Sequence, residues 1–251
     1  MKPQWGPDRH LSIVVPAYNE EVRLAKSLDA MAEYYCSQSY SWNITVVSDG
    51  SDDRTDQIVT EFAARHPQFS LLSYRPNRGK GYAVRKGMLA ASGEWVLFMD
   101  ADLATPLTET EKLISHLVDG ADVAIGSRPL RESKLEKHQP FLREALGRTA
   151  NALVQLLAVR GIRDTQCGFK LFARDVARDV FRRCKLDGFS FDFEALMVAR
   201  DLGYRIDEVP IRWSHQEGSK VVFWRDYPRA LRDLVKLRLK GKAKRLEPNE
   251  P

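Results

Sequence analysis

Short apolar runs of strand length alternate with segments of helical periodicity through the first half of this 251-residue sequence. We expect strands at residues 11–16, 43–48, 69–74, 94–99 and 122–126, and helices at residues 20–35, 53–66, 81–91 and 108–118. Such alternation predicts βαβ units, and therefore an α/β fold whose mostly parallel, doubly wound sheet carries helices on both faces. Ligands of such sheets bind beyond the carboxyl ends of the strands.

The second half contains the same kinds of segment in a less regular order. We expect an amphipathic helix at residues 141–159, strands at 169–172 and 205–213, and helices at 175–184 and 193–202. No internal repeat and no linker rich in proline, glycine or serine divides the sequence. We therefore expect a single domain over residues 1–251. Its successive parts are about 11–128, 129–224 and 225–251.

The composition is that of an ordinary globular protein with a basic surplus, 43% hydrophobic and 29% charged with a formal charge of +5. No apolar run approaches the roughly 18–20 residues of a membrane-spanning helix. Residues 1–8 lack the apolar core of a signal peptide, so we expect no export. Three cysteines, Cys36, Cys167 and Cys184, are an odd and sparse set that indicates free thiols in a reducing, cytoplasmic compartment.

The basic surplus is concentrated near the C-terminus, where residues 225–245 hold nine basic residues and two acidic ones. Apolar residues at partly helical spacing predict a basic amphipathic helix after Pro228. Two roles stay open for this helix: packing on the domain with a solvated basic face, or peripheral docking onto anionic lipid headgroups, worth ~1 kcal/mol per basic residue. Nucleic acid is not an expected partner, because no RNP or zinc-finger pattern accompanies the charge.

Polar, acidic or glycine-rich turns follow four consecutive predicted strands. They are residues 16–21, 48–55, 77–81 and 100–102. Because parallel strands end at the same edge of a sheet, we expect these turns to converge on one cleft. A single acidic turn often only caps a helix. The coincidence of four such turns is what favours a ligand site.

Asp100 and Asp102 flank one residue directly after the apolar run that ends at Met99. Two carboxylates at this spacing repel each other unless a cation lies between them. Hard oxygen ligands that leave coordination positions open suit Mg²⁺ or Mn²⁺ bound jointly with substrate phosphates. The alternative is a pair of turn or helix-capping acids without a metal.

Gly79-Lys80-Gly81 stands at the start of a predicted helix, where glycines let the backbone approach an anion and Lys80 adds a positive charge. The stretch does not match the Walker A pattern, and no G-x-G-x-x-G follows the first strand. A dinucleotide cofactor is therefore disfavoured. A nucleoside diphosphate bound with a divalent metal fits these turns better.

In their order along the chain, these motifs resemble the signatures of family 2 glycosyltransferases with the GT-A fold. The motifs are Val14-Val15-Pro16-Ala17-Tyr18-Asn19-Glu20, Asp49-Gly50-Ser51, Asn77-Arg78-Gly79-Lys80-Gly81 and Asp100-Ala101-Asp102. Later motifs are similar to the branch that glycosylates polyprenyl phosphates, closest to dolichyl-phosphate β-glucosyltransferases, with dolichyl-phosphate mannosyltransferases nearby. These are Asp164-Thr165-Gln166-Cys167-Gly168-Phe169-Lys170, Phe191-Asp192-Phe193-Glu194 and Gly218-Ser219-Lys220-Val221. The resemblance runs from about residue 11 to about residue 224.

The resemblance implies a nucleotide-sugar site at about 11–128 and an acceptor side at about 129–224. The nucleoside would be held by Pro16, Tyr18, Glu20 and Asp49. Lys80 and Asp100 would lie against base, ribose or phosphate, and Asp102 would take the metal. The remaining roles are phosphate contact for Arg128, a place near the sugar or metal for Asp164, and a position over the diphosphate for Lys220. One departure is Ser48, where relatives usually have an acid.

A phosphate acceptor would be largely a dianion at neutral pH, because its second pKa lies near ~6, so no strong general base is needed. Asp102, Asp164 and Lys220 would then act by charge and position, and single displacement would invert the anomeric configuration. A neutral hydroxyl acceptor would instead require a base, with Asp164 as its first candidate.

The acceptor side is expected to include Arg143, Arg148, Ser219 and Lys220 beside the C-terminal helix. We expect transfer of glucose from UDP-glucose to a polyprenyl phosphate. Two alternatives stay open: a GDP-mannose-dependent enzyme acting on the same acceptor, and a soluble family 2 glycosyltransferase with a sugar or small-molecule acceptor. The sequence does not distinguish a UDP-hexose from a GDP-hexose donor.

Overall fold

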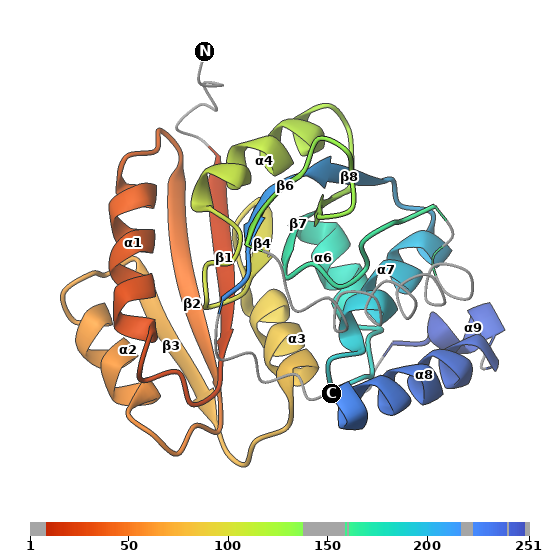
Figure 1. Ribbon diagram of the computed structural model, residues 1–251, viewed down its shortest axis with the longest axis horizontal. Helices are drawn as coiled ribbons and strands as arrows, with labels where there is room; N and C mark the ends of the chain where they lie inside the picture. Colours follow the sequence, from red (N-terminus) through yellow and green to blue (C-terminus); the bar gives the residue numbers. More distant parts are fainter. Residues whose placement is uncertain (1–8, 138–158, 160, 217–222, 240, 249–251) are drawn as a thin grey trace.

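The computed structural model describes residues 9–137, 159, 161–216, 223–239 and 241–248, and its centre is a seven-stranded sheet (Figure 1). The strand order is β3-β2-β1-β4-β7-β5-β8, and β7 alone runs antiparallel to its neighbours in this sheet. The strands are β1 (His10–Ala17), β2 (Ser41–Asp49), β3 (Phe69–Tyr74), β4 (Trp95–Met99), β5 (Val123–Ser127), β7 (Phe169–Ala173) and β8 (Ile206–Pro210). The predicted α/β fold with a mostly parallel sheet is confirmed.

Helices cover both faces of this sheet, as a doubly wound arrangement requires. One face carries α1 (Leu24–Cys36), α2 (Thr55–Ala63), the 3₁₀ turn η1 (Leu107–Glu109) and α4 (Thr110–Val118). The other carries α3 (Lys80–Ala90), α6 (Arg174–Phe181) and α7 (Phe191–Leu202), and α8 (Phe223–Leu239) adds Leu234 and Leu237 to the same cluster. Each layer buries its own apolar cluster against the sheet.

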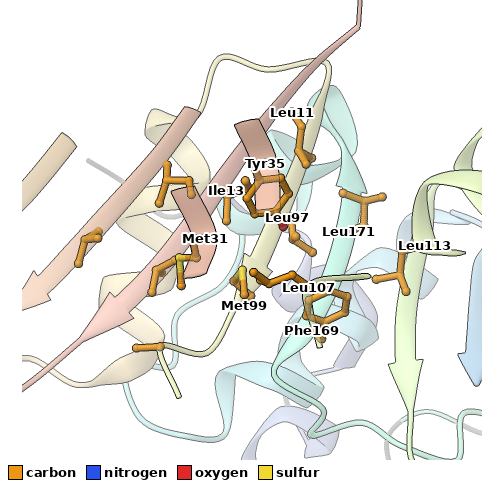
Figure 2. Packing of buried hydrophobic residues seen from close by; sticks show 14 of the residues in the cluster. Leu11, Ile13, Met31, Tyr35, Leu97, Met99, Leu107, Leu113, Phe169 and Leu171 are labelled. Carbon is orange, nitrogen blue, oxygen red and sulfur yellow. The ribbon is translucent and has the colours of Figure 1, made fainter. Parts of the chain in front are cut away.

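Successive residues of β1 point to opposite faces, so this strand contributes to both clusters. Leu11 and Ile13 join the cluster beneath α1, where Figure 2 shows them close to Tyr35 and Leu97, whereas Val14 joins the cluster beneath α3. A strand buried on both faces has an unbroken apolar sequence, as the run at 11–16 does. The polar turn that follows β1 is therefore carried by a rigid, fully packed strand.

Two of the boundaries that differ from the prediction have clear local reasons. Helix α1 begins at Leu24 instead of residue 20, because Asn19 has a positive φ of 50° and the carbonyl of Glu20 accepts the first turn's hydrogen bonds. The strand predicted at 205–213 is divided between β8 and β9 (Arg212–Ser214). Strand β9 pairs with β6 (Lys134–Lys137) in a separate two-stranded sheet.

Helix α8 begins before Pro228, although the sequence predicted a start after it. Proline favours helix starts, but here the burial of Leu234 and Leu237 outweighs the one hydrogen bond that Pro228 cannot donate. The short helix α9 (Gly241–Arg245) follows, and Arg245 pairs with Asp201 at 2.6 Å. Within the described ranges, no helix is long and apolar enough to cross a membrane. The helix predicted at 141–159 lies outside the described residues except for Val159.

Candidate active site

A cleft of about 1060 Å³ opens at the carboxyl ends of β1, β2 and β4. All four predicted turns reach it, so their convergence is confirmed. The predicted donor residues that line it are Pro16, Tyr18, Glu20, Asp49, Lys80, Asp100 and Asp102. Residues 188–190, just before α7, and part of α8 also line the cleft. The fold has thus brought together residues from six separate parts of the sequence.

The carboxylate of Asp49 holds the turn between β3 and α3. Its Oδ1 accepts hydrogen bonds from Tyr74 Oη and from the backbone N–H of Arg78, both at 2.8 Å. Its Oδ2 accepts hydrogen bonds from Asn77 Nδ2 at 2.9 Å and from the Gly79 N–H at 2.7 Å. Asp49 therefore shapes one wall of the cleft by ordering this turn, and its contact with a nucleoside stays a prediction.

The first N–H groups of α3 are already used within the protein. Those of Gly81 and Tyr82 donate to the carbonyl oxygen of Asp187 at 2.7 and 3.2 Å. A Cβ on Gly81 would lie 2.4 Å from the carbonyl oxygen of Leu186, so glycine is needed for this close approach. The N–H groups of both glycines thus already donate to protein oxygens, including the Asp49 carboxylate, and the approach of this backbone to a ligand anion stays a prediction.

Lys80 places a positive charge at the floor of the cleft. Its Nζ lies 2.6 Å from Oδ1 of Asp100 and 5.4 Å from the ring centre of Phe98. Burial lowers the pKa of Lys80, but the charges of Asp100 and Asp192 raise it by more, so the pKa lies above its ordinary value. Lys80 is therefore a permanent cation available to offset the charge of a bound phosphate.

Asp100 and Asp102 form the acidic centre of the cleft. Burial, together with the charge of Asp100, raises the pKa of Asp102 above its ordinary value, while a hydrogen bond from the Ala104 N–H at 3.0 Å opposes the shift. The two aspartates and Gly168 also line a small hollow of about 20 Å³, which is large enough for one water molecule or one ion of similar size. A divalent cation beside Asp102 would relieve the repulsion between the two carboxylates. Their oxygen atoms are therefore suitable ligands for Mg²⁺ or Mn²⁺.

Two carboxylates alone do not complete a coordination sphere. Among the residues that the structure describes, no group of three or more His, Cys, Asp and Glu side chains could hold a metal. The remaining ligands would have to be water and phosphate oxygens of a substrate, as is usual for Mg²⁺. Such a set of ligands would tie metal binding to binding of that substrate.

Lys170 and Asp192 form a second ion pair, which interacts electrostatically with Lys80 and was not predicted as part of the site. Both side chains are buried, and Lys170 Nζ also donates to the carbonyl of Cys167 at 2.5 Å. Burial raises the pKa of Asp192, although the charges of Lys170 and Lys80 oppose the shift. One feature of the sequence could have identified them: Lys170 ends the motif at residues 164–170 and Asp192 lies in the motif at residues 191–194, and both motifs carry the family resemblance.

Arg128 and Asp164 are paired with each other. Nε and Nη2 of Arg128 lie 2.6 and 2.8 Å from the two carboxylate oxygens. Burial opposes ionisation of Asp164, but the charge and hydrogen bonds of Arg128 hold its pKa below the ordinary value. Neither residue lines the cleft; Arg128 stacks 5.4 Å from the ring centre of Trp213, which borders the hollow beside Asp100 and Asp102. The Arg128–Asp164 pair is therefore separated from the hollow by Trp213.

The acceptor side is only partly described. Arg143, Arg148, Ser219 and Lys220 lie outside the described residues. Instead, α8 contributes Arg229, Arg232 and Asp233 to the cleft, and α1 begins beside Arg23, which pairs with Glu20 at 2.9 Å. The basic charge of α8 is evident from the sequence, whereas its partial orientation toward the cleft is not.

A family model described as Glycosyl transferase family 2 matches residues 12–181, more than half of the chain. A dolichyl-phosphate beta-glucosyltransferase of Trichomonas vaginalis is 40% identical over 227 residues, which cover 86% of this chain and 69% of the relative. The enzyme of that name from Homo sapiens is 35% identical over 249 residues, 94% of this chain and 76% of the relative. The chain belongs to glycosyltransferase family 2.

Solved structures of glucosyl-3-phosphoglycerate synthase from Mycobacterium tuberculosis share the fold. The complex with phosphoglyceric acid has a TM-score of 0.66 at 20% identity, covering 92% of this chain and 80% of that one. The complex with Mn²⁺, UDP-glucose and phosphoglyceric acid has a TM-score of 0.65 at 18% identity, covering 97% and 82%. The predicted GT-A fold is thereby confirmed, and the protein is a glycosyltransferase.

Proposed function

We propose that this protein transfers glucose from UDP-glucose to dolichyl phosphate or another polyprenyl phosphate, giving a β-linked lipid-phosphate sugar. Relatives named dolichyl-phosphate beta-glucosyltransferase, including that of Drosophila melanogaster at 40% identity, support both the sugar and the acceptor. The structural observation that carries the proposal is the aspartate pair Asp100 and Asp102, set in a cleft of about 1060 Å³. That volume lies at the upper end of small-molecule sites and accommodates a nucleotide sugar beside an acceptor phosphate.

Asp102, with Asp100 beside it, would hold Mg²⁺ or Mn²⁺ together with the donor diphosphate. When bound, the ion supplies Lewis-acid stabilisation of the charge on the departing diphosphate. Lys80 adds a fixed positive charge at the same place, since its ammonium group lies 2.6 Å from Asp100. We assign the nucleoside to the walls formed by Pro16, Tyr18 and the turn that Asp49 orders, and Lys220 to the diphosphate.

The acceptor phosphate supplies its own nucleophile. As a dianion it needs no deprotonation, so one of its oxygens forms the bond to the anomeric carbon while the bond to the donor diphosphate breaks and its electron pair leaves with UDP. This single displacement inverts the configuration. Asp164 is poorly suited to be a base, because Arg128 lowers its pKa and engages both of its carboxylate oxygens. We assign it a positioning role.

The test is to incubate purified protein with labelled UDP-glucose and Mg²⁺ or Mn²⁺, with and without a short polyprenyl phosphate. Acceptor-dependent label in a lipid-extractable product is the expected result, and labelled GDP-mannose in a parallel assay should give far less. Preferred transfer from GDP-mannose would assign the mannosyl alternative. Label found only in a sugar or small-molecule product would overturn the lipid acceptor.

We further propose that α8 rests on an anionic membrane, where the acceptor lies. Leu231, Val235 and Leu239 recur at every fourth position and are 45%, 43% and 81% exposed, forming an apolar stripe on α8. Exposed Lys236 and Arg238 place positive charge beside this stripe. An apolar helix face flanked by basic residues suits an interface with anionic lipid. None of the three cysteines forms a disulfide, which supports the cytoplasmic side. We treat 1–251 as one working unit because β7 and β8 complete the sheet.

A further inference from the structure

Two arginines of α8 face the cleft. Arg229 and Arg232 are three residues apart, so they lie on one side of the helix about one turn from each other, and both line the cleft that contains Asp102. Leu234 and Leu237 are 0% and 4% exposed and belong to the core cluster beneath α3. These buried leucines fix the rotation of α8, and therefore the side on which the two arginines stand.

The cleft has other cationic side chains, and two of them, Arg23 and Lys80, lie within hydrogen-bond distance of a carboxylate. The described cations that line it are Arg23, Arg78, Lys80, Arg229 and Arg232. The first three are paired as follows: Arg23 with Glu20 at 2.9 Å, Arg78 with Asp187 at 3.9 Å, and Lys80 with Asp100 at 2.6 Å. All three stand on the β1 and α3 side, where the donor motifs are.

The α8 arginines are differently placed. Nη2 of Arg232 is 3.7 Å from Oδ1 of Asp233, which is an ion pair without a hydrogen bond, like that of Arg78, and the Arg232 side chain is 63% exposed. Among the residues that the structure describes, no carboxylate lies within ion-pair distance of Arg229. Two neighbouring guanidinium groups repel each other, and their planar donor arrays match the oxygens of a phosphate. An anion bound between them would therefore be strongly favoured.

We propose that Arg229 and Arg232 bind the phosphate group of the acceptor, an assignment that rests on the proposed function. The donor diphosphate would be served by Lys80 and by a metal held at Asp100 and Asp102, beside the β1 and α3 turns. The incoming phosphate dianion would be repelled by that diphosphate and by any uncompensated charge of Asp100 and Asp102. The α8 arginines offset this repulsion and hold the phosphate within the cleft.

The test compares Arg229→Gln, Arg232→Gln and the double variant with the unmodified full chain. A short, water-soluble isoprenyl phosphate serves as acceptor without membranes, so that lipid binding plays no part. Each single change should raise the acceptor KM about tenfold, the effect of losing one charge-assisted hydrogen bond. The KM for UDP-glucose and the melting temperature should stay unchanged. Arg200→Gln, which removes an exposed arginine of α7 away from the cleft, is the matched control.

An unchanged acceptor KM in the double variant would overturn the assignment, as would a rise confined to the KM for UDP-glucose. Calorimetric binding of isoprenyl phosphate separates this inference from the proposed function. If the unmodified protein binds it, the double variant does not, and no glucose is transferred, the arginine site stands and the proposed function fails. Binding of glycerol 3-phosphate in preference to isoprenyl phosphate, again lost in the double variant, would retain the site but assign it to a soluble phosphate acceptor. No binding of either by the unmodified protein would refute the site.

Discussion

A Cβ added to Gly168 would stand 1.9 Å from Oδ2 of Asp100, far inside any permitted contact. The same glycine accepts a hydrogen bond through its carbonyl from the backbone N–H of Asp100 at 3.1 Å. The position of the Asp100 carboxylate thus depends on the lack of a side chain at residue 168, which directly precedes β7 in the other half of the chain.

Gly168→Ala should therefore reduce activity more than stability. We expect kcat for glucosyl transfer to fall about 100-fold, the cost of a displacement of roughly 1 Å in a catalytic site. Steady-state kinetics and thermal unfolding measure the two effects. Combining Gly168→Ala with Asp100→Asn provides the control, because residues that act through one another are not additive. Fully additive losses in the double variant would show that Gly168 does not act through Asp100.

Asp102→Asn should remove the proposed main metal ligand and lower metal-dependent transfer by more than about 100-fold. Loss of a residue that only hydrogen-bonds to a metal ligand already lowers metal affinity or activity by about 10–100-fold. Binding of Mn²⁺ in the presence of UDP, measured by electron paramagnetic resonance, should weaken in parallel. Asp52→Asn is the control, because Asp52 is a 73% exposed acid outside the cleft lining. Substantial metal-dependent activity in the Asp102 variant would remove it as a ligand.

The buried pair Lys170 and Asp192 should matter for stability. Lys170→Met leaves the Asp192 charge buried without its partner, and we expect the free energy of unfolding in urea to fall by about 3–5 kcal/mol. Adding Asp192→Leu to that variant should restore much of the loss, because no buried charge then remains at either position. Asp52→Asn, which breaks an exposed pair with Arg75, should cost no more than about 1 kcal/mol. Equal effects of the buried and exposed changes would contradict the role of burial.

The Asp164–Arg128 pair should make stability depend on acid pH. The folded-state pKa of Asp164 is lowered, so its stabilisation is fully present above the unfolded value near ~3.9 and is lost as pH falls through the lower folded value. Asp164→Asn should therefore flatten the fall of unfolding free energy between about pH 5 and pH 3. Asp175→Asn, which removes an 89% exposed acid, should leave that slope unchanged. An unaltered slope in the Asp164 variant would contradict this linkage.

The apolar stripe of α8 should determine binding to lipid. Changing Leu231, Val235 and Leu239 to Gln together should weaken binding to anionic liposomes at least tenfold in sedimentation assays, because about 0.8 kcal/mol is lost per CH₂ group withdrawn from the interface. Val118→Gln is the matched control, since Val118 is 49% exposed on α4. Binding by the unmodified protein should also fall with added salt. Equal binding by the triple variant would rule out this surface.

Much of the donor side could be predicted because its signals are local. Strand β3 occupies the predicted residues 69–74, and β1 and β4 are recognisable because burial on both faces demands unbroken apolar sequence. Once those strands are parallel, their polar turns must meet at one edge. The cleft lined by Glu20, Asp49, Lys80 and Asp102 follows from that rule.

The remainder depends on contacts between distant segments. A run of five residues does not say which strands it will join, so the antiparallel place of β7 between β4 and β5 was not foreseen. The pairing of Arg128 with Asp164 joins residues 36 positions apart and could be found only from coordinates. Arg229 faces the cleft because Leu234, on another side of α8, is buried in the core. Helical periodicity alone does not say toward which part of the protein each side of the helix turns.

The central place of β7 also affects the order in which the protein can become active during synthesis. A nascent chain that has emerged only as far as β5 can pair β3, β2, β1 and β4, yet the outer edge of β4 stays open until Phe169–Ala173 leaves the ribosome. Until then that edge is free to pair with other chains, and Asp100 lacks the Gly168 carbonyl that holds its backbone. A truncated product ending before Gly168 would carry every donor motif and still lack the finished site.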